Sequence, residues 1–317
     1  MSEGAMGEGV AMSADVASLR IDCRNELGES PVWCRESGTL YWVDVVKPGR
    51  VFHWRTAASQ VDFWDFDHLV TGLNLIEGGS LLVHGKNRIL RFDPISGESL
   101  PVFSLPPADA KMRFNDGRCD EAGRLWVGTM PNNIDDDGAA LDIVDRNGRI
   151  CVIGSTASRN IEAHLGCPNA ICWSPDYSTF YIADSCDGWL YSYSFDSSAG
   201  TISDRRRFCY LEGLGIPDGA AVDRDGCIWN ARWGAGAVAR IRPDGSLDRV
   251  IRLPVSQPTS CCFGDEDRRT LYITSARFSL TSERLQAEPL AGGVFSIRLD
   301  VAGIEQPRFS PPVRSLI

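Results

Sequence analysis

Ala170-Ile-Cys-Trp-Ser-Pro-Asp-Tyr-Ser-Thr-Phe-Tyr-Ile-Ala-Asp184 shows how this chain is built. Two short apolar runs, rich in aromatic and β-branched residues, are separated by a turn at Pro175–Tyr177, and this arrangement predicts a pair of antiparallel strands. A third strand-like run, Trp189–Tyr193, follows at once. Helical periodicity is almost absent from the chain as a whole. The sequence therefore predicts an all-β fold made from short strands and tight turns.

The same unit recurs six times. Its second strand begins at Leu40, Leu81, Leu125, Phe180, Ile228 and Leu271, so the spacings are 41, 44, 55, 48 and 43 residues. Repeats of this length with several strands each are typical of propeller blades. The predicted architecture is a six-bladed β-propeller with four-stranded blades. A pair of stacked β-sandwich domains is the alternative.

Fourth strands are recognisable in most units, but the candidate in the third unit, near Ser158–Ala163, is poor, and the sixth unit has none after it. An unassigned strand, Ser18–Cys23, precedes the first unit. Added to the last blade it would close the ring and cover two sheet edges. We therefore predict a lead-in at residues 1–17, without regular structure, and a single propeller domain at residues 18–317, closed by this N-terminal strand.

Composition narrows the classes of function. The 317 residues carry 42 acidic against 32 basic side chains, a net charge of −10, with no basic block, which disfavours nucleic acid or a membrane surface as partner. No apolar run is long enough to span a bilayer, and Met1–Val16 lacks the features of a secretory signal. The 11 cysteines show no CxxC spacing and are expected to be reduced and mostly buried. These features predict a cytoplasmic protein, monomeric by default, with a dimer possible.

Four polar residues stand at the same point of the repeat. Glu29, Asn115, Asn169 and Asp218 lie 11, 10, 11 and 10 residues before the second strands of their units. Because the first strand of each blade lines the central channel, the four side chains should meet at one mouth of that channel. Oxygen donors without His or Cys suit Ca²⁺, Mg²⁺ or Mn²⁺, and Zn²⁺ also accepts carboxylate. Taken singly, each residue is also compatible with an ordinary turn or cap, as in Pro217-Asp-Gly219.

Other motifs are weak. The four histidines occupy unrelated points of the repeat, and HExxH, GxSxG and phosphate-binding glycine loops are absent from the sequence. The long connection Met130–Asn147 contains Asn132-Asn-Ile-Asp-Asp-Asp-Gly138, which partly matches a calcium-binding loop but lacks the closing glutamate. We interpret it as a solvated acidic loop over one face of the ring; a role as a lid stays open.

Several motifs, in order along the chain, resemble the regucalcin/gluconolactonase (senescence-marker-protein) family. They are Gly28-Glu-Ser-Pro-Val-Trp33, Arg113-Phe-Asn-Asp-Gly-Arg118 with Gly128-Thr-Met130, Asn169 before Trp173, Ile216-Pro-Asp-Gly219 and Thr259-Ser-Cys-Cys-Phe-Gly264. The resemblance implies a six-bladed propeller with one catalytic divalent metal that hydrolyses sugar lactones. It implies that Glu29, Asn169 and Asp218 hold the metal and that Arg113 and Asn115 bind substrate. Asn133 stands near where some members carry an acidic substrate contact, which leaves the preferred sugar open.

The implied reaction is hydrolysis of an aldonolactone to its aldonic acid, with Asp218 as the general base that activates water. The implied cofactor is one divalent ion, Ca²⁺ first, with Zn²⁺, Mn²⁺, Mg²⁺ or Fe²⁺ as alternatives. Two other functions are compatible with the same residues. One is an esterase or phosphotriesterase-like hydrolase on the same propeller, and the other is a calcium-binding propeller without catalysis.

Overall fold

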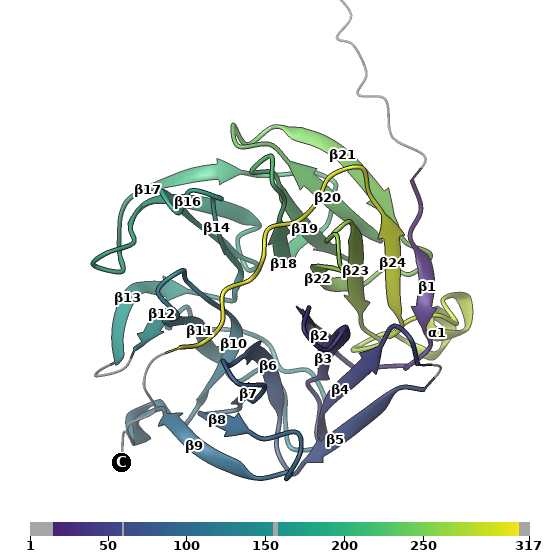
Figure 1. Ribbon diagram of the computed structural model, residues 1–317, viewed down its shortest axis with the longest axis horizontal. Helices are drawn as coiled ribbons and strands as arrows, with labels where there is room; N and C mark the ends of the chain where they lie inside the picture. Colours follow the sequence, from purple (N-terminus) through teal and green to yellow (C-terminus); the bar gives the residue numbers. More distant parts are fainter. Residues whose placement is uncertain (1–14, 59, 155–157, 311–317) are drawn as a thin grey trace, which may run out of the picture.

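The computed structural model describes residues 15–58, 60–154 and 158–310, and nearly every regular element within these ranges is a β-strand. The strands form six antiparallel sheets of four, arranged like blades around one central axis (Figure 1). The predicted six-bladed propeller is confirmed. Residues 1–14 of the predicted lead-in and residues 311–317 lie outside the described residues, and the single-domain boundary at residues 18–317 stays a prediction.

Each blade runs from an innermost strand at the axis to an outermost strand at the rim. The first three blades are β2 (Gly28–Cys34), β3 (Thr39–Asp44), β4 (Gly49–Arg55) and β5 (Asp62–Phe66); β6 (Val70–Leu75), β7 (Leu81–Gly85), β8 (Arg88–Phe92) and β9 (Ser99–Ser104); and β10 (Met112–Cys119), β11 (Leu125–Pro131), β12 (Gly148–Ile153) and β13 (Ser158–Leu165). The next two are β14 (Pro168–Trp173), β15 (Thr179–Asp184), β16 (Trp189–Asp196) and β17 (Thr201–Cys209); and β18 (Ile216–Val222), β19 (Ile228–Trp233), β20 (Ala237–Ile241) and β21 (Leu247–Arg252).

The sixth blade is shared by the two ends of the chain. Its strands are β22 (Pro258–Gly264), β23 (Thr270–Ser275), β24 (Val294–Arg298) and, outermost, β1 (Ser18–Ile21). β1 pairs antiparallel with β24, with Ser18 opposite Ser296 and Leu19 opposite Phe295. The predicted closure by the N-terminal strand is confirmed. Two short helical elements, η1 (Pro107–Asp109) and α1 (Ser282–Ala287), lie in connections of the described chain.

Two details differ from the sequence-based prediction. The third blade does have a fourth strand, β13, where the sequence signal was poor, because its residues are mostly exposed at the rim and carry little apolar pattern. Several innermost strands also begin earlier than predicted; β18, for example, starts at Ile216, so Asp218 lies inside the strand rather than before it.

A buried acid–tryptophan pair locks the turn of two blades. Asp120 and Asp223 are both fully buried, and each accepts a hydrogen bond from the indole of the second strand, Trp126 at 2.9 Å and Trp229 at 2.8 Å. Backbone N–H groups of each turn donate to the same carboxylates. Asp223 also accepts from Arg240 Nε at 2.8 Å. The carboxylates thus hold the turn and the core tryptophan together.

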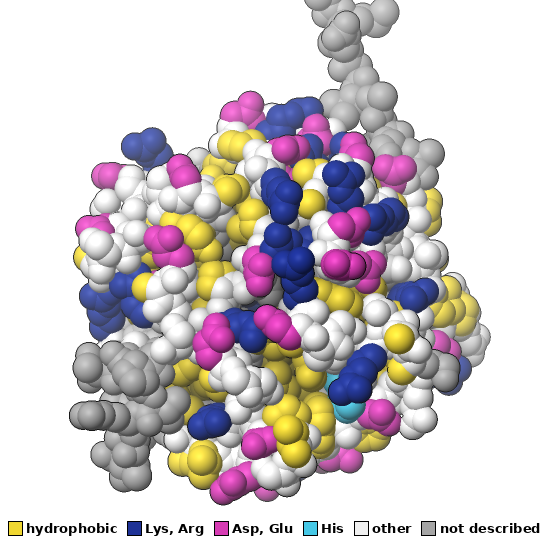
Figure 2. All heavy atoms as spheres, in the orientation of Figure 1, with side chains coloured by type: hydrophobic (Ala, Val, Ile, Leu, Met, Phe, Trp, Pro, Cys, Tyr) yellow, Lys and Arg dark blue, Asp and Glu magenta, His cyan; other side chains and the backbone are white. Residues whose placement is uncertain are grey.

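The C-terminal segment after β24 crosses one mouth of the central channel (Figure 1). Ile304 N donates to Val222 O and Phe309 N donates to Leu75 O, so the segment spans from blade 5 to blade 2. Charged side chains of both signs gather around the centre of this face (Figure 2). We call residues 303–310 the C-terminal strap.

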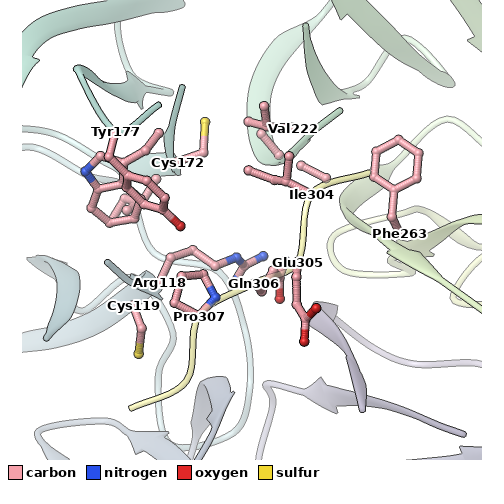
Figure 3. Close-up of a pocket in the computed structure, with 14 residues that line it drawn as sticks. Arg118, Cys119, Cys172, Tyr177, Val222, Phe263, Ile304, Glu305, Gln306 and Pro307 are labelled. Atoms are coloured by element: carbon pink, nitrogen blue, oxygen red, sulfur yellow. The ribbon is translucent and has the colours of Figure 1, made fainter. Parts of the chain in front are cut away.

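Beneath the strap lies a cavity of about 50 Å³ (Figure 3). Apolar side chains such as Val222 and Phe263 line it together with Arg118, which extends toward the strap segment that carries Glu305. Ligand pockets typically measure ~300–1,000 Å³, so this cavity is too small for a sugar-sized molecule.

The 11 cysteines all lie in the described part of the chain, and none of them is paired in a disulfide. Seven are buried, Cys186 is exposed and the others are intermediate, so the prediction that most of them are buried is confirmed. Among the described residues, the structure has no helix with the length and apolarity needed to cross a membrane.

Replacing Asp223 with alanine should lower the free energy of unfolding by about 3–5 kcal/mol, because it leaves the Trp229 indole and the two N–H groups of the turn without their acceptor, while Arg240 keeps its other carboxylate partners. Urea denaturation measures the effect. Asp225→Ala is the matched control, since Asp225 contacts the same arginine but its side chain is 65% exposed. The control should change stability by less than about 1 kcal/mol. Equal losses for the two variants would contradict the locking role of Asp223.

Candidate functional site

The four predicted polar residues do meet at one mouth of the channel. Glu29, Asn115, Asn169 and Asp218 all line one pocket, at the N-terminal ends of the innermost strands β2, β10, β14 and β18. The strap contacts the C-terminal ends of innermost strands, whereas the pocket lies toward their N-terminal ends. The pocket and the strap are therefore at opposite mouths of the channel.

Each of the four residues lies at an irregularity of its strand. The register shifts between Glu29 and Val32, and equivalent shifts occur in β10, β14 and β18 around the other three residues. The residues after Glu29 and Asn169, Ser30 and Ala170, have φ of 48° and 53°, which is unusual for side chains other than glycine. Bulges re-aim side chains and recur next to active sites. Here they turn the polar side chains out of the ladder and into the pocket.

Hydrogen bonds link three of the blades at this mouth. Arg113 NH1 donates to Asn115 Oδ1 at 2.7 Å, and Asn115 Nδ2 donates to Asn169 Oδ1 at 2.8 Å. Asn169 Nδ2 donates to Ser185 Oγ at 2.9 Å, and Ser185 Oγ donates to Pro217 O, the residue before Asp218, at 2.7 Å. The network fixes the orientation of both amides and places the oxygen of Asn169 toward blade 3.

Arg113 is also held by the loop that follows β11. Its Nε and NH2 both donate to Asn133 Oδ1, at 3.0 and 2.8 Å, and its NH1 donates to Phe114 O. Burial lowers the pKa of Arg113 below its usual value, while neighbouring negative charges such as Glu29 oppose that shift. The predicted substrate residues Arg113, Asn115 and Asn133 are therefore brought together as one hydrogen-bonded group.

The two carboxylates are poorly compensated. Burial raises the pKa of Glu29 to about 8, and the charge of Asp116 adds to the shift; the Ser30 N–H and the charges of Arg118 and Arg113 offset it only in part. Burial also raises the pKa of Asp218 well above its usual value, followed by the charges of Glu29 and Asp116. Two acids that resist ionisation so strongly in one pocket indicate a place where a positive charge is missing.

The pocket has a volume of about 370 Å³, within the range of small-molecule sites. Two residues of the Met130–Asn147 connection, Asn133 and Ile143, line it, while Asp136 and Asp137 of the same loop are exposed. Asp135 accepts hydrogen bonds from the backbone of Asp137 and Ala139, which is an ordinary turn arrangement. The loop thus forms part of the pocket wall, and its acidic segment faces away from the other site residues.

Sequence reasoning missed several residues near the site. Asp116 is buried, pairs with Arg118 at 3.3 Å and accepts from Ile171 N, and its charge acts on both Glu29 and Asp218. Asp116 belongs to the Arg113–Arg118 motif, so the motif could have identified it. The comparison of equivalent positions in the repeat selected the adjacent residue, Asn115, instead. Ser185 lies five residues after Phe180, the point of the repeat that Val45 and Trp233 occupy in their blades, and all three line the pocket. Counting back from the second strands did not reach this position.

His84 is the other missed residue. It is fully buried, and burial together with the charge of Arg118 lowers its pKa to about 3, so the ring is neutral. Added Cβ atoms at Gly72 and Gly117 would each lie within about 3.0 Å of the ring, which means that these glycines make room for it. Its place in the second strand of blade 2, outside the repeat position of the other residues, explains why the sequence pattern did not select it.

Comparison with known proteins adds the family. Residues 27–277 match the family described as SMP-30/Gluconolactonase/LRE-like region. This chain belongs to that family. A 6-deoxy-6-sulfogluconolactonase from Pseudomonas putida is 35% identical over 90% of this chain and 95% of its own, and an L-arabinolactonase from Azospirillum brasilense is 32% identical over 94% and 96%.

Among solved structures, a protein titled as a calcium-binding protein, regucalcin, from Agrobacterium tumefaciens superposes with a TM-score of 0.86. It is 27% identical and covers 93% of this chain and 98% of its own. Membership in the SMP-30/gluconolactonase family is therefore supported by sequence along most of the chain and by the fold.

The site residues suit a hard divalent cation. Glu29, Asn169 and Asp218 offer two carboxylates and one amide oxygen, and a positive charge among them would counteract the burial and the mutual repulsion that raise both pKa values. No group of three or more His, Cys, Asp or Glu side chains in the described residues is arranged to hold a metal, so an ion at this place would depend on the amide. Cys167 packs beside Asn169 Nδ2, with its Sγ at 3.7 Å, and burial raises the pKa of its thiol.

The raised pKa of Glu29 predicts how the stability of the metal-free protein depends on pH. Between the ordinary value of 4.5 and the folded value of about 8, the folded state binds more protons than the unfolded state, so the free energy of unfolding falls as pH rises through this window. Glu29→Gln removes this contribution. In thermal melts with EDTA, the melting temperature of the variant minus that of the wild type should increase from pH 5 to pH 8.

Calcium provides the control for this prediction. At pH 8 an excess of Ca²⁺ should raise the melting temperature of the wild type more than that of Glu29→Gln. A ligand that binds the folded state stabilises it in proportion to its affinity, and the variant lacks one of the two carboxylates. The opposite result would be a melting temperature of the wild type that rises relative to that of the variant between pH 5 and pH 8. It would show that Glu29 ionises readily in the folded protein without a bound cation.

Proposed function

We propose that this protein is a metal-dependent sugar lactonase, a hydrolase of carboxylic ester bonds that opens an aldonolactone to the aldonic acid. The observation that carries the proposal is the pocket in which two carboxylates of raised pKa, Glu29 and Asp218, lie beside amide oxygens and the buried Arg113. Family membership and relatives named as lactonases support the same reaction.

We assign the metal to Glu29, Asn169 and Asp218. Held by these three side chains, a divalent ion would supply Lewis-acid polarisation of the lactone carbonyl and would offset the negative charge that develops on its oxygen. Ca²⁺ is the first candidate, since the donors are all oxygen and a related solved structure is titled as a calcium-binding protein. Zn²⁺, Mn²⁺, Mg²⁺ and Fe²⁺ are the alternatives to be compared.

Asp218 acts as the general base. Its carboxylate accepts a proton from the water that attacks the carbonyl carbon, and a new C–O bond forms. The ring C–O bond then breaks, and the proton held on Asp218 passes to the ring oxygen as it leaves as a hydroxyl group.

Arg113, Asn115 and Asn133 orient the substrate. Arg113 and Asn115 are tied to each other and to Asn169, so a ring hydroxyl or the carbonyl oxygen bound by this group has a fixed position relative to Asp218. Asn133 presents its amide nitrogen as a donor, because its oxygen already accepts from Arg113. The substrate is thus a small neutral molecule, and the excess of negative charge on the chain disfavours nucleic acid and anionic membranes. We propose a cytoplasmic monomer as the working form.

The function is tested by following acid release from a panel of aldonolactones with a pH indicator. The protein is stripped of metal, and Ca²⁺, Mg²⁺, Mn²⁺, Fe²⁺ or Zn²⁺ is returned singly. Hydrolysis above the spontaneous rate, lost with EDTA and restored by an ion, is the expected result. Metal binding without acceleration of any lactone would favour the calcium-binding propeller, and turnover of aryl esters or phosphotriesters alone would favour the other hydrolases.

Asp218→Asn should lower kcat by about 10²-fold or more, because the amide cannot accept the proton and general bases contribute ~10²–10⁴-fold. The assay uses variant protein whose metal content has been verified, since Asp218 is also assigned to the ion. Asp136→Asn, the same change in an exposed part of the pocket loop, is the control and should leave kcat unchanged. Near-normal turnover by metal-loaded Asp218→Asn would remove Asp218 from the mechanism.

A further inference from the structure

The pocket has two walls of opposite character. Its polar side comes from blades 3 and 4 and contains the hydrogen-bonded group of Arg113, Asn115, Asn133, Asn169 and Ser185. The facing side comes from blades 5, 6 and 1. Besides the carboxylates of Glu29 and Asp218 it carries five apolar residues, which we call the apolar wall: Leu27, Val45, Ile216, Trp233 and Phe278.

The apolar wall is a fixed surface that continues into the core. Val45 and Phe278 are buried members of one hydrophobic cluster, and Leu27 and Trp233 pack against the same cluster. The backbone is tied as well: Val45 N donates to Leu27 O at 3.0 Å, and Phe278 N donates to Glu26 O at 2.8 Å. A substrate group placed against this wall meets rigid apolar side chains, whose one side-chain hydrogen-bond donor is the indole N–H of Trp233 and which offer no acceptor.

The pocket is also unsuited to an anionic substituent. Among the described residues that line it, Arg113 is the only cation, and its guanidinium already donates to Asn133, Asn115 and Phe114 O. Arg146, which donates to the backbone oxygen of Cys186 at the rim, stands 3.7 Å from the carboxylates of both Asp184 and Asp187. A sulfonate or phosphate would face the apolar wall or the two site carboxylates, and burial of an unpaired charge is strongly unfavourable.

We propose that the substrate is a 6-deoxy-sugar lactone, whose terminal methyl group lies on the apolar wall while its ring hydroxyls face blades 3 and 4. This inference rests on the proposed lactonase function and narrows it. A hydroxymethyl group in place of the methyl would bury a hydroxyl whose proton finds no acceptor among the side chains of the wall. A lactone with no hydroxyls would leave the amides of the polar side unmatched. The relative from Pseudomonas putida is named for a lactone with a sulfonate at the same carbon, so this chain would differ from it in the group that its pocket accepts.

The test compares substrate pairs that differ only at that carbon. L-rhamnono-1,4-lactone is compared with L-mannono-1,4-lactone, and L-fucono-1,4-lactone with L-galactono-1,4-lactone, using the wild-type protein with its best metal. In at least one pair, kcat/KM for the deoxy member should exceed that of its partner by about 10-fold or more. A hexonolactone carrying a 6-phosphate should be the poorest substrate.

Two variants connect the preference to the wall. Val45→Thr replaces a methyl of the wall with a hydroxyl at nearly constant size and should reduce the deoxy preference by about threefold or more. Val43→Thr is the matched control, because Val43 belongs to the same buried cluster but does not line the pocket, and it should leave the ratio unchanged. Ile216→Thr is a second wall variant whose folding is not at risk, since Ile216 is 44% exposed.

The possible outcomes distinguish failure of the deoxy-sugar inference from failure of the proposed lactonase function. Failure to hydrolyse any lactone, with metal bound, overturns the proposed function. Hydrolysis with equal or greater kcat/KM for the hydroxymethyl members of both pairs overturns the deoxy-sugar inference and leaves the lactonase intact. Faster turnover of an alkyl lactone without ring hydroxyls also overturns it, in favour of a general apolar ester substrate. A deoxy preference that both wall variants retain unchanged overturns the role of the wall.

Discussion

Closure of the ring is the constraint on which the rest of this structure depends. Six blades can surround an axis only if the last is joined to the first, and here the pairing of β1 with β24 makes that join within blade 6. Because the closing strand comes from the N-terminal side and its three partners come from the C-terminal side, separation of the blades requires this pairing to break. The ring in turn fixes the innermost strands around one axis, so that Glu29 and Asp218, which are 189 positions apart, share a pocket.

The site is built from departures from regular strand geometry. At each of the four polar positions the pairing register shifts, and at two of them a residue with a side chain adopts positive φ. Such backbone is tolerated where the surroundings determine it fully. The network from Arg113 through Asn115, Asn169 and Ser185 to Pro217 supplies that determination, because it ties the irregular segments of three blades together. The same hydrogen bonds therefore stabilise the distorted backbone and orient the groups assigned to chemistry.

The features that could be predicted from the sequence are those that recur in each blade, and the features that could not are those that do not recur. The blades, the closing strand and the convergence of Glu29, Asn115, Asn169 and Asp218 were predictable, because each is a consequence of one pattern used six times. The bulges were not, since a register shift depends on the pairing partner and leaves no periodic signal, and so the innermost strands began earlier than expected. The apolar wall was also unpredictable. Val45 and Trp233 stand at one point of the repeat, five residues after the starts of their second strands, but Leu27 and Phe278 do not. The four meet because blades 1, 5 and 6 come together in the closed ring.

The C-terminal strap has a kinetic consequence for a pocket at the other mouth. Ile304 and Phe309 are held to blades 5 and 2, and the strap lies across the axis (Figure 1). A small molecule in the pocket therefore leaves by the same mouth through which it entered. In the proposed lactonase reaction, an opened acid still in the pocket would occupy the place of the next lactone and compete with it. Each turnover would then include the departure of a newly formed carboxylate from a pocket that holds two others.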